Sequence, residues 1–64
     1  TMDNNLDKET NDKLTYYTIL YDRAVVALNV YEYNKVDQSV IDCQRHRVEQ
    51  AKRDLELFKE AINT

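Results

Sequence analysis

The chain has 64 residues, of which 42% are hydrophobic and 33% are charged, with a formal net charge of −3 at pH 7. A chain of this length forms one domain at most and buries a smaller share of its surface than larger domains do, so a core closed within one molecule is marginal. Cys43 is the only cysteine, which excludes a disulfide within the chain and makes a reducing cytoplasm the expected compartment.

The sequence contains neither glycine nor proline. Hairpin turns, β-bulges and phosphate-binding loops commonly need a residue with a positive or fixed φ, so this composition disfavours β structure and nucleotide-binding loops. The longest apolar run, Ala24 to Leu28, is far shorter than the roughly 18 to 20 residues that cross a bilayer. The polar start does not resemble a signal peptide, and Met2, preceded by a Thr1 typical of cloning, is the expected natural start of a complete small protein. We therefore expect an all-α protein without a membrane span.

The first half of the chain is predicted to form one long helix after a polar lead. Residues 1–7 have the polar, acidic composition of a disordered lead. Tyr, Val and Ile, which favour strands, are frequent from Leu14 to Tyr33, but strict alternation fails within 24–28. Polar residues instead recur at steps of three, four and seven: Thr15, Thr18, Asp22, Asn29 and Glu32. These helical steps predict helix one over about residues 8–34.

The second half of the chain predicts another helix, from about residue 39 to 62. Ser39 followed by Asp42 approximates a capping box at its start. A seven-residue repeat then defines a coiled-coil-like seam: Ile41, Val48, Leu55 and Ile62, with Gln44, Ala51 and Phe58. Asn34 is the candidate for a left-handed cap in the short link, which implies antiparallel neighbours. The chain is thus predicted to be a single helical-hairpin domain, 1–64.

Helix one has more apolar surface than one partner helix covers. Its first apolar face, which we expect against helix two, is Leu14, Tyr17, Tyr21, Ala24, Leu28 and Tyr31. A second face has nothing to pack on within a hairpin: Tyr16, Ile19, Leu20, Arg23, Val26, Ala27, Val30 and Tyr33. Exposed apolar patches and tyrosines are typical of interaction surfaces. We expect a homodimer that forms a four-helix bundle, with docking on a different, larger protein as the other reading, and the role of a small adaptor, regulator or inhibitor.

Two polar residues interrupt these apolar faces. Gln44 falls on the seam of helix two, where a polar residue can set register at a cost in stability. Arg23, in the second face of helix one, can pair with Asp22 or Glu32 of a neighbour. In the alternative reading, both long side chains extend to water.

Arg45, Arg47 and Arg53 of helix two define an alternative function in nucleic-acid binding. Their surroundings argue against it, because acidic residues precede basic ones by three residues at Asp42, Glu49 and Glu56. Phosphate-binding surfaces normally have a clear basic excess, which the segment 39–62 lacks. The architecture is analogous to the Rop-type RNA-binding protein, a helical hairpin that dimerises into a bundle, but no motif is shared.

Cys43, His46 and Glu49 are spaced three residues apart, with Asp42 nearby, and invite a metal site. A closed zinc site needs four ligands, which this set does not complete within one chain, so we expect no metal or cofactor and a Cys43 that is partly buried. A Cys43–His46 nucleophile pair lacks any oxyanion-binding loop, since none can be built from two helices without glycine. We expect no enzymatic activity.

Overall fold

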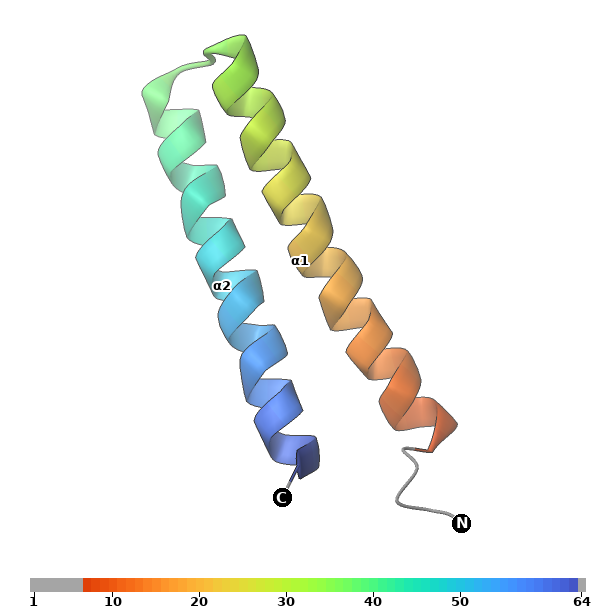
Figure 1. Cartoon of the computed structure of the whole chain (residues 1–64). Helices are drawn as coiled ribbons and strands as arrows, with labels where there is room; N and C mark the ends of the chain where they lie inside the picture. Colours follow the sequence, from red (N-terminus) through yellow and green to blue (C-terminus); the bar gives the residue numbers. More distant parts are fainter. Residues whose placement is uncertain (1–6, 64) are drawn as a thin grey trace.

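The protein is a hairpin of two long antiparallel helices (Figure 1). The computed structural model describes residues 7–63, in which α1 spans Lys8–Asn34, α2 spans Gln38–Asn63, and there is no strand. The predicted all-α hairpin is confirmed; the lead expected at 1–7 lies, apart from Asp7, outside the described residues. The hairpin measures 51 × 16 × 12 Å, with a radius of gyration of 15.1 Å. A compact chain of this length has a radius of about 11 Å, so the molecule is a rod.

Helix α1 begins with a side-chain cap at Asp7. The Asp7 Oδ1 accepts a hydrogen bond of 2.7 Å from the backbone amide of Thr10, one of the first-turn amides that have no partner within the helix. The hydrogen bonds from the Thr10 backbone and side chain hold the pKa of the Asp7 carboxyl below its ordinary value, and the charge of Lys13 lowers it further. The carboxylate also suits the positive end of the helix dipole.

Helix α1 ends in a Schellman motif formed around Lys35, not Asn34. Lys35 has φ 54° and ψ 44°, in the left-handed region, while Asn34 is the last helical residue. The Lys35 amide donates to the Glu32 carbonyl at 3.2 Å, and the Val36 amide donates to the Tyr31 carbonyl at 3.3 Å. The Asn34 side chain instead donates to the Val30 carbonyl at 3.0 Å, inside the helix. The predicted cap is therefore one residue too early.

Helix α2 begins at Gln38, one residue before the predicted start, so Ser39 is already helical. The Asp37 carbonyl accepts the first bonds, from the amides of Val40 at 3.0 Å and Ile41 at 3.2 Å. The Asp42 carboxylate accepts from the Gln38 side chain at 2.9 Å, so it is engaged within the helix surface. The capping box predicted at Ser39 is thus wrong, because the helix begins one residue earlier, at Gln38.

The two helices meet along the two predicted seams, and every residue of both seams is buried or half-buried. The most deeply buried apolar side chains are Ile41 and Leu55 of α2, each 7% exposed. Towards the open end of the hairpin, the rings of Tyr17 and Phe58 pack at 5.2 Å between centroids. The apolar repeat of α2 therefore supplies most of the buried core.

Among residues 7–63, two polar side-chain contacts join the helices: Gln44 with Ala24, and Arg45 with Glu32. Gln44, 7% exposed, donates from Nε2 to the Ala24 carbonyl at 3.0 Å. The alternative in which Gln44 extends to water is therefore wrong, since the side chain crosses the seam to α1. Glu32 accepts from the Arg45 guanidinium at 2.9 Å, but both side chains are nearly half exposed, so this pair contributes at most about 1 kcal/mol.

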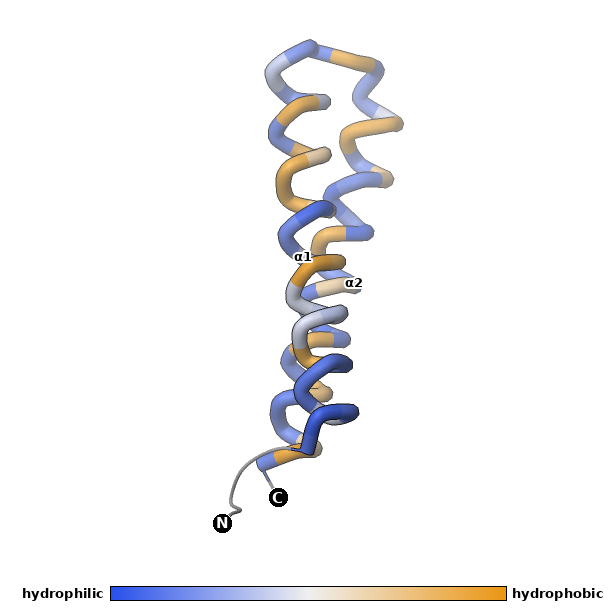
Figure 2. The backbone as a smooth tube through the Cα atoms, turned by 90° about the vertical axis from the view of Figure 1, so that its right-hand side faces the viewer, coloured by the Kyte–Doolittle hydropathy of each residue, from blue (hydrophilic) through white to orange (hydrophobic). Residues whose placement is uncertain are grey.

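Helix α1 is unusually exposed for a helix with so many apolar residues. Within Lys8–Asn34 no residue is fully buried, and Figure 2 shows hydrophobic residues along its middle and C-terminal turns, beyond a hydrophilic N-terminal end. The chain exposes 5132 Å², whereas a compact protein of 7.6 kDa exposes about 4,300 Å². Neither helix contains a stretch that is both long and apolar enough to cross a membrane.

Candidate functional site

The predicted interaction surface is present as an exposed face of α1, which we call the outer face. Its large apolar side chains are exposed to solvent: Leu20 is 40% exposed, Val26 59% and Tyr33 86%. Arg23 is exposed as well, while Ala27 is half-buried. The full outer face comprises Tyr16, Ile19, Leu20, Arg23, Val26, Ala27, Val30 and Tyr33.

Six residues of the outer face have the spacing of a second coiled-coil seam. The inner seam against α2 has steps of three and four residues: Leu14, Tyr17, Tyr21, Ala24, Leu28 and Tyr31. The same steps, displaced by two residues, define an outer seam: Tyr16, Ile19, Arg23, Val26, Val30 and Tyr33. At 3.5 residues per turn a displacement of two residues is a rotation of about 155° the short way round the helix. The outer seam therefore faces away from α2, with Leu20 and Ala27 along one edge.

Arg23 lies within the outer seam, and the adjacent Asp22 lies on the edge of the seam. Among residues 7–63 neither forms an ion pair. Consecutive helical residues point in directions about 100° apart, so the two side chains do not face each other within one helix. Glu32, the other acid predicted to answer Arg23, is already paired with Arg45 of its own chain. Asp22 is consequently the acid of this surface that is available to a neighbour.

Shallow grooves continue the apolar surface from α1 towards α2. One, of about 270 Å³, is lined by Leu20 and Ala24 of α1 and by Arg47, Ala51 and Asp54 among the residues of α2. Two other large apolar side chains of α2, Val40 and Leu57, are 43% and 57% exposed, but neither lines this groove. Sequence reasoning missed these two side chains, because they lie outside the seven-residue repeat; their large apolar character was the only signal. Leu20 connects the outer face with the groove.

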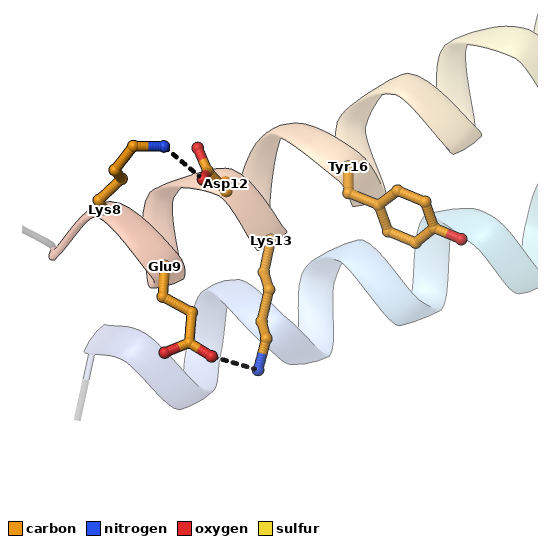
Figure 3. A pocket seen from close by; sticks show the side chains of 5 residues that line it. All are labelled: Lys8, Glu9, Asp12, Lys13 and Tyr16. Atoms are coloured by element: carbon orange, nitrogen blue, oxygen red, sulfur yellow. Dashed lines mark hydrogen bonds and ion pairs between the residues drawn. The ribbon is translucent and has the colours of Figure 1, made fainter.

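A hollow near the N-terminus of α1 is lined mostly by paired charges (Figure 3). Lys8 bonds Asp12 at 3.0 Å, and Glu9 lies 4.0 Å from Lys13, each pair four residues apart on the helix. Tyr16, the first residue of the outer seam, forms the remaining wall. The carboxylates of Glu9 and Asp12 both have lysine partners and are exposed to solvent. Neither carboxylate is therefore placed as a reactive group.

The three arginines of the alternative nucleic-acid site do not form one patch. Arg45 is engaged by Glu32 at 2.9 Å and by Asp42 at 3.4 Å. Arg47 lies on the groove side of α2, and Arg53 is exposed. At about 100° per residue, Arg47 is turned about 160° from Arg45 around the axis, so the two point to nearly opposite sides.

The acidic and basic residues spaced three apart in α2 form ion pairs only in part. Of the three pairs spaced by three residues, Asp42–Arg45 is within ion-pair distance. In the described part of the chain, Glu49–Lys52 and Glu56–Lys59 are not. These side chains extend separately into water, where an exposed pair gains little.

The cysteine and histidine of α2 do not build a metal centre in the described chain. Cys43 is exposed, which corrects the expectation of a partly buried residue, and His46 is exposed as well. Within residues 7–63, no group of three or more His, Cys, Asp or Glu side chains is placed to hold a metal ion. No protein-family model, curated protein or solved structure matches this chain.

Proposed function

We propose that this chain is a small, non-enzymatic protein-interaction module that acts through the outer face of α1 as an adaptor, regulator or inhibitor. The observation that carries the proposal is an apolar face left open on a helix with no fully buried residue. Contiguous exposed apolar patches on small proteins are typical of interaction sites. Its lone cysteine suits a reducing cytoplasm.

The proposed interaction includes self-association, in which two hairpins assemble into four helices through their outer faces. The chain exposes roughly 800 Å² more than a compact monomer of its mass, and the apolar side chains of the outer face are part of this exposed surface. Ile19, Leu20, Val26 and Val30 are each about half exposed. Completing their burial returns about 1 kcal/mol each, and a symmetric dimer doubles that gain.

Substitution of Val26 by Asp tests the proposed surface. A charge at this position is desolvated without a partner in any complex that covers the outer face, so Val26→Asp should abolish association. Leu57→Asp is a matched control, because Leu57 is 57% exposed against 59% for Val26 but lies on α2. Light scattering coupled to size exclusion should show a dimer for the wild type and Leu57→Asp, and a monomer for Val26→Asp.

The same pair of variants serves for a larger protein partner. In a pull-down from the native host, the wild type and Leu57→Asp should retain the partner and Val26→Asp should lose it. A wild-type monomer that also captures nothing dependent on Val26 would contradict the proposal. The nucleic-acid alternative predicts binding in a gel shift that weakens steeply with salt and is lost when Arg45, Arg47 and Arg53 are replaced. The engagement of Arg45 by two carboxylates supports the protein-binding reading.

A further inference from the structure

We propose that the outer seam binds a second copy of this chain in parallel and in register, so that the two α1 helices lie side by side in the centre and each α2 lies on the outside. This inference rests on the proposed self-association through the outer face and adds its direction and register. The result is a flattened row of four helices, α2–α1–α1–α2.

The angle between the two seams of α1 is the first evidence for the row of four helices. The outer seam is rotated about 155° from the inner seam that packs on α2. A square four-helix bundle places the neighbours of each helix about 90° apart, whereas seams on nearly opposite sides place one helix between its two neighbours. Helix α1, apolar on both sides, fits the central position, and α2 has a seven-residue repeat on one side only.

Charge complementarity selects a second copy as the occupant. The outer seam contains one charge, Arg23, and its edge contains one acid with no partner among residues 7–63, Asp22. In a parallel pair of helices, the seam position of Arg23 on one helix lies close to the edge position just before it on the partner helix, which is the position of Asp22. Arg23 of each copy therefore reaches Asp22 of the other copy. The two-fold axis repeats this contact, so the dimer contains two Arg23–Asp22 pairs.

The antiparallel arrangement satisfies the same face less well. If the whole seam is covered, Arg23 lies beside Val26 of the partner subunit, and the acidic edge is on the other side of the seam. This buries a charge without its acid, which is costly. If the helices slide so that Arg23 meets the partner's Asp12 instead, Val30 and Tyr33 extend past the position where the partner's α1 begins. Only the parallel register both covers the apolar residues and pairs Arg23 with an acid.

The parallel register also stacks like residues in layers. Tyr16 and Tyr33 form the two end layers, where tyrosine rings bury their edges and keep their hydroxyls in water. Ile19, Val26 and Val30 form dry layers between them. The Arg23 layer is a polar interruption near the middle, of the kind that fixes register and orientation in coiled coils.

Disulfide trapping in the full chain tests direction and register. In a Cys43→Ser background, which removes the exposed native thiol, Val30→Cys places both cysteines in one layer of the parallel dimer. In the antiparallel arrangement that covers the whole seam, Val30 lies opposite Ile19 of the partner. The two Val30 positions are then about 16 Å apart along the axis, well beyond the span of about 7 Å that a disulfide bridges. Leu57→Cys, on the outer helix, is the control that should remain uncrosslinked.

The expected result is a covalent Val30→Cys dimer, and only like-with-like dimers when Val30→Cys and Ile19→Cys proteins are mixed and analysed by mass. A mixed Ile19–Val30 disulfide would overturn the parallel register while leaving the interface in place. If no variant cross-links and light scattering shows monomers, the self-association itself is refuted. In addition, Arg23→Asp should weaken the dimer about tenfold, and adding Asp22→Arg should restore it.

Discussion

The clearest consequence of an exposed α1 is that the stability of the fold should depend on protein concentration. Unfolding of a dimer separates two chains, so each tenfold dilution lowers the free energy of unfolding by about 1.4 kcal/mol. The two helices have 27 and 26 residues per chain, so a dimer unfolds about 106 ordered residues. At about 2.1 cal/mol/K per residue the unfolding entropy is about 0.22 kcal/mol/K. The melting temperature should therefore fall by about 6 °C for each tenfold dilution.

Circular dichroism at the helical minimum, recorded from about 5 to about 500 µM in cells of different path length, measures this slope. Leu57→Asp should keep the slope of the wild type. Val26→Asp should melt at a lower temperature and show no slope, because its hairpin unfolds as a single chain. A wild-type melting temperature that stays constant across the range would mean that the hairpin is complete as a monomer, and the reasoning from the outer face would fail.

Three further tests concern the structure itself. Lys35→Gly relieves the left-handed backbone and should raise the free energy of unfolding by about 0.5–1 kcal/mol, whereas Lys52→Gly, inside α2, should lower it by about 1 kcal/mol; equal effects in thermal melts would reject the Schellman assignment. Gln44→Ala removes a buried amide and its bond to Ala24 and should cost about 1–3 kcal/mol in urea unfolding; a value near zero would show that the contact is not maintained in solution. The lowered pKa of Asp7 stabilises the fold above the ordinary carboxyl pKa of 3.8 and ceases to do so as the pH falls through the folded-state pKa; helicity should thus decline more on acidification in the wild type than in Asp7→Asn, and identical curves would contradict the cap.

The seams of both helices were predictable because a local rule produces them. Side chains three and four residues apart lie on one face of a helix, so the repeat through Ile41 and Leu55 identifies the buried side without knowledge of the partner. The outer face followed from the same rule, as the apolar residues of α1 that remain once one seam is assigned. No pattern of this kind reports Val40 and Leu57, whose exposure depends on how far α1 covers the sides of α2.

The details of the link were not predictable from local preference. Asparagine tolerates the left-handed conformation better than lysine, which favours a cap at Asn34. In the structure the Asn34 side chain bonds within α1, and the chain reverses one residue later, at Lys35. A lysine in the left-handed conformation costs about 1 kcal/mol. The hydrogen bonds that the Lys35 and Val36 amides donate to α1, together with the packing of α2, offset this cost.

What the sequence by itself determined is the set of faces: two long helices, one apolar on both sides and one with a single apolar stripe. These properties depend on residues within a few positions of each other, so composition and spacing are sufficient to establish them. Only the tertiary structure decided which polar groups meet across the hairpin. Gln44 reaches the Ala24 carbonyl and Arg45 reaches Glu32 because antiparallel packing brings together residues that are far apart in the chain, and no spacing rule within one helix encodes those distances.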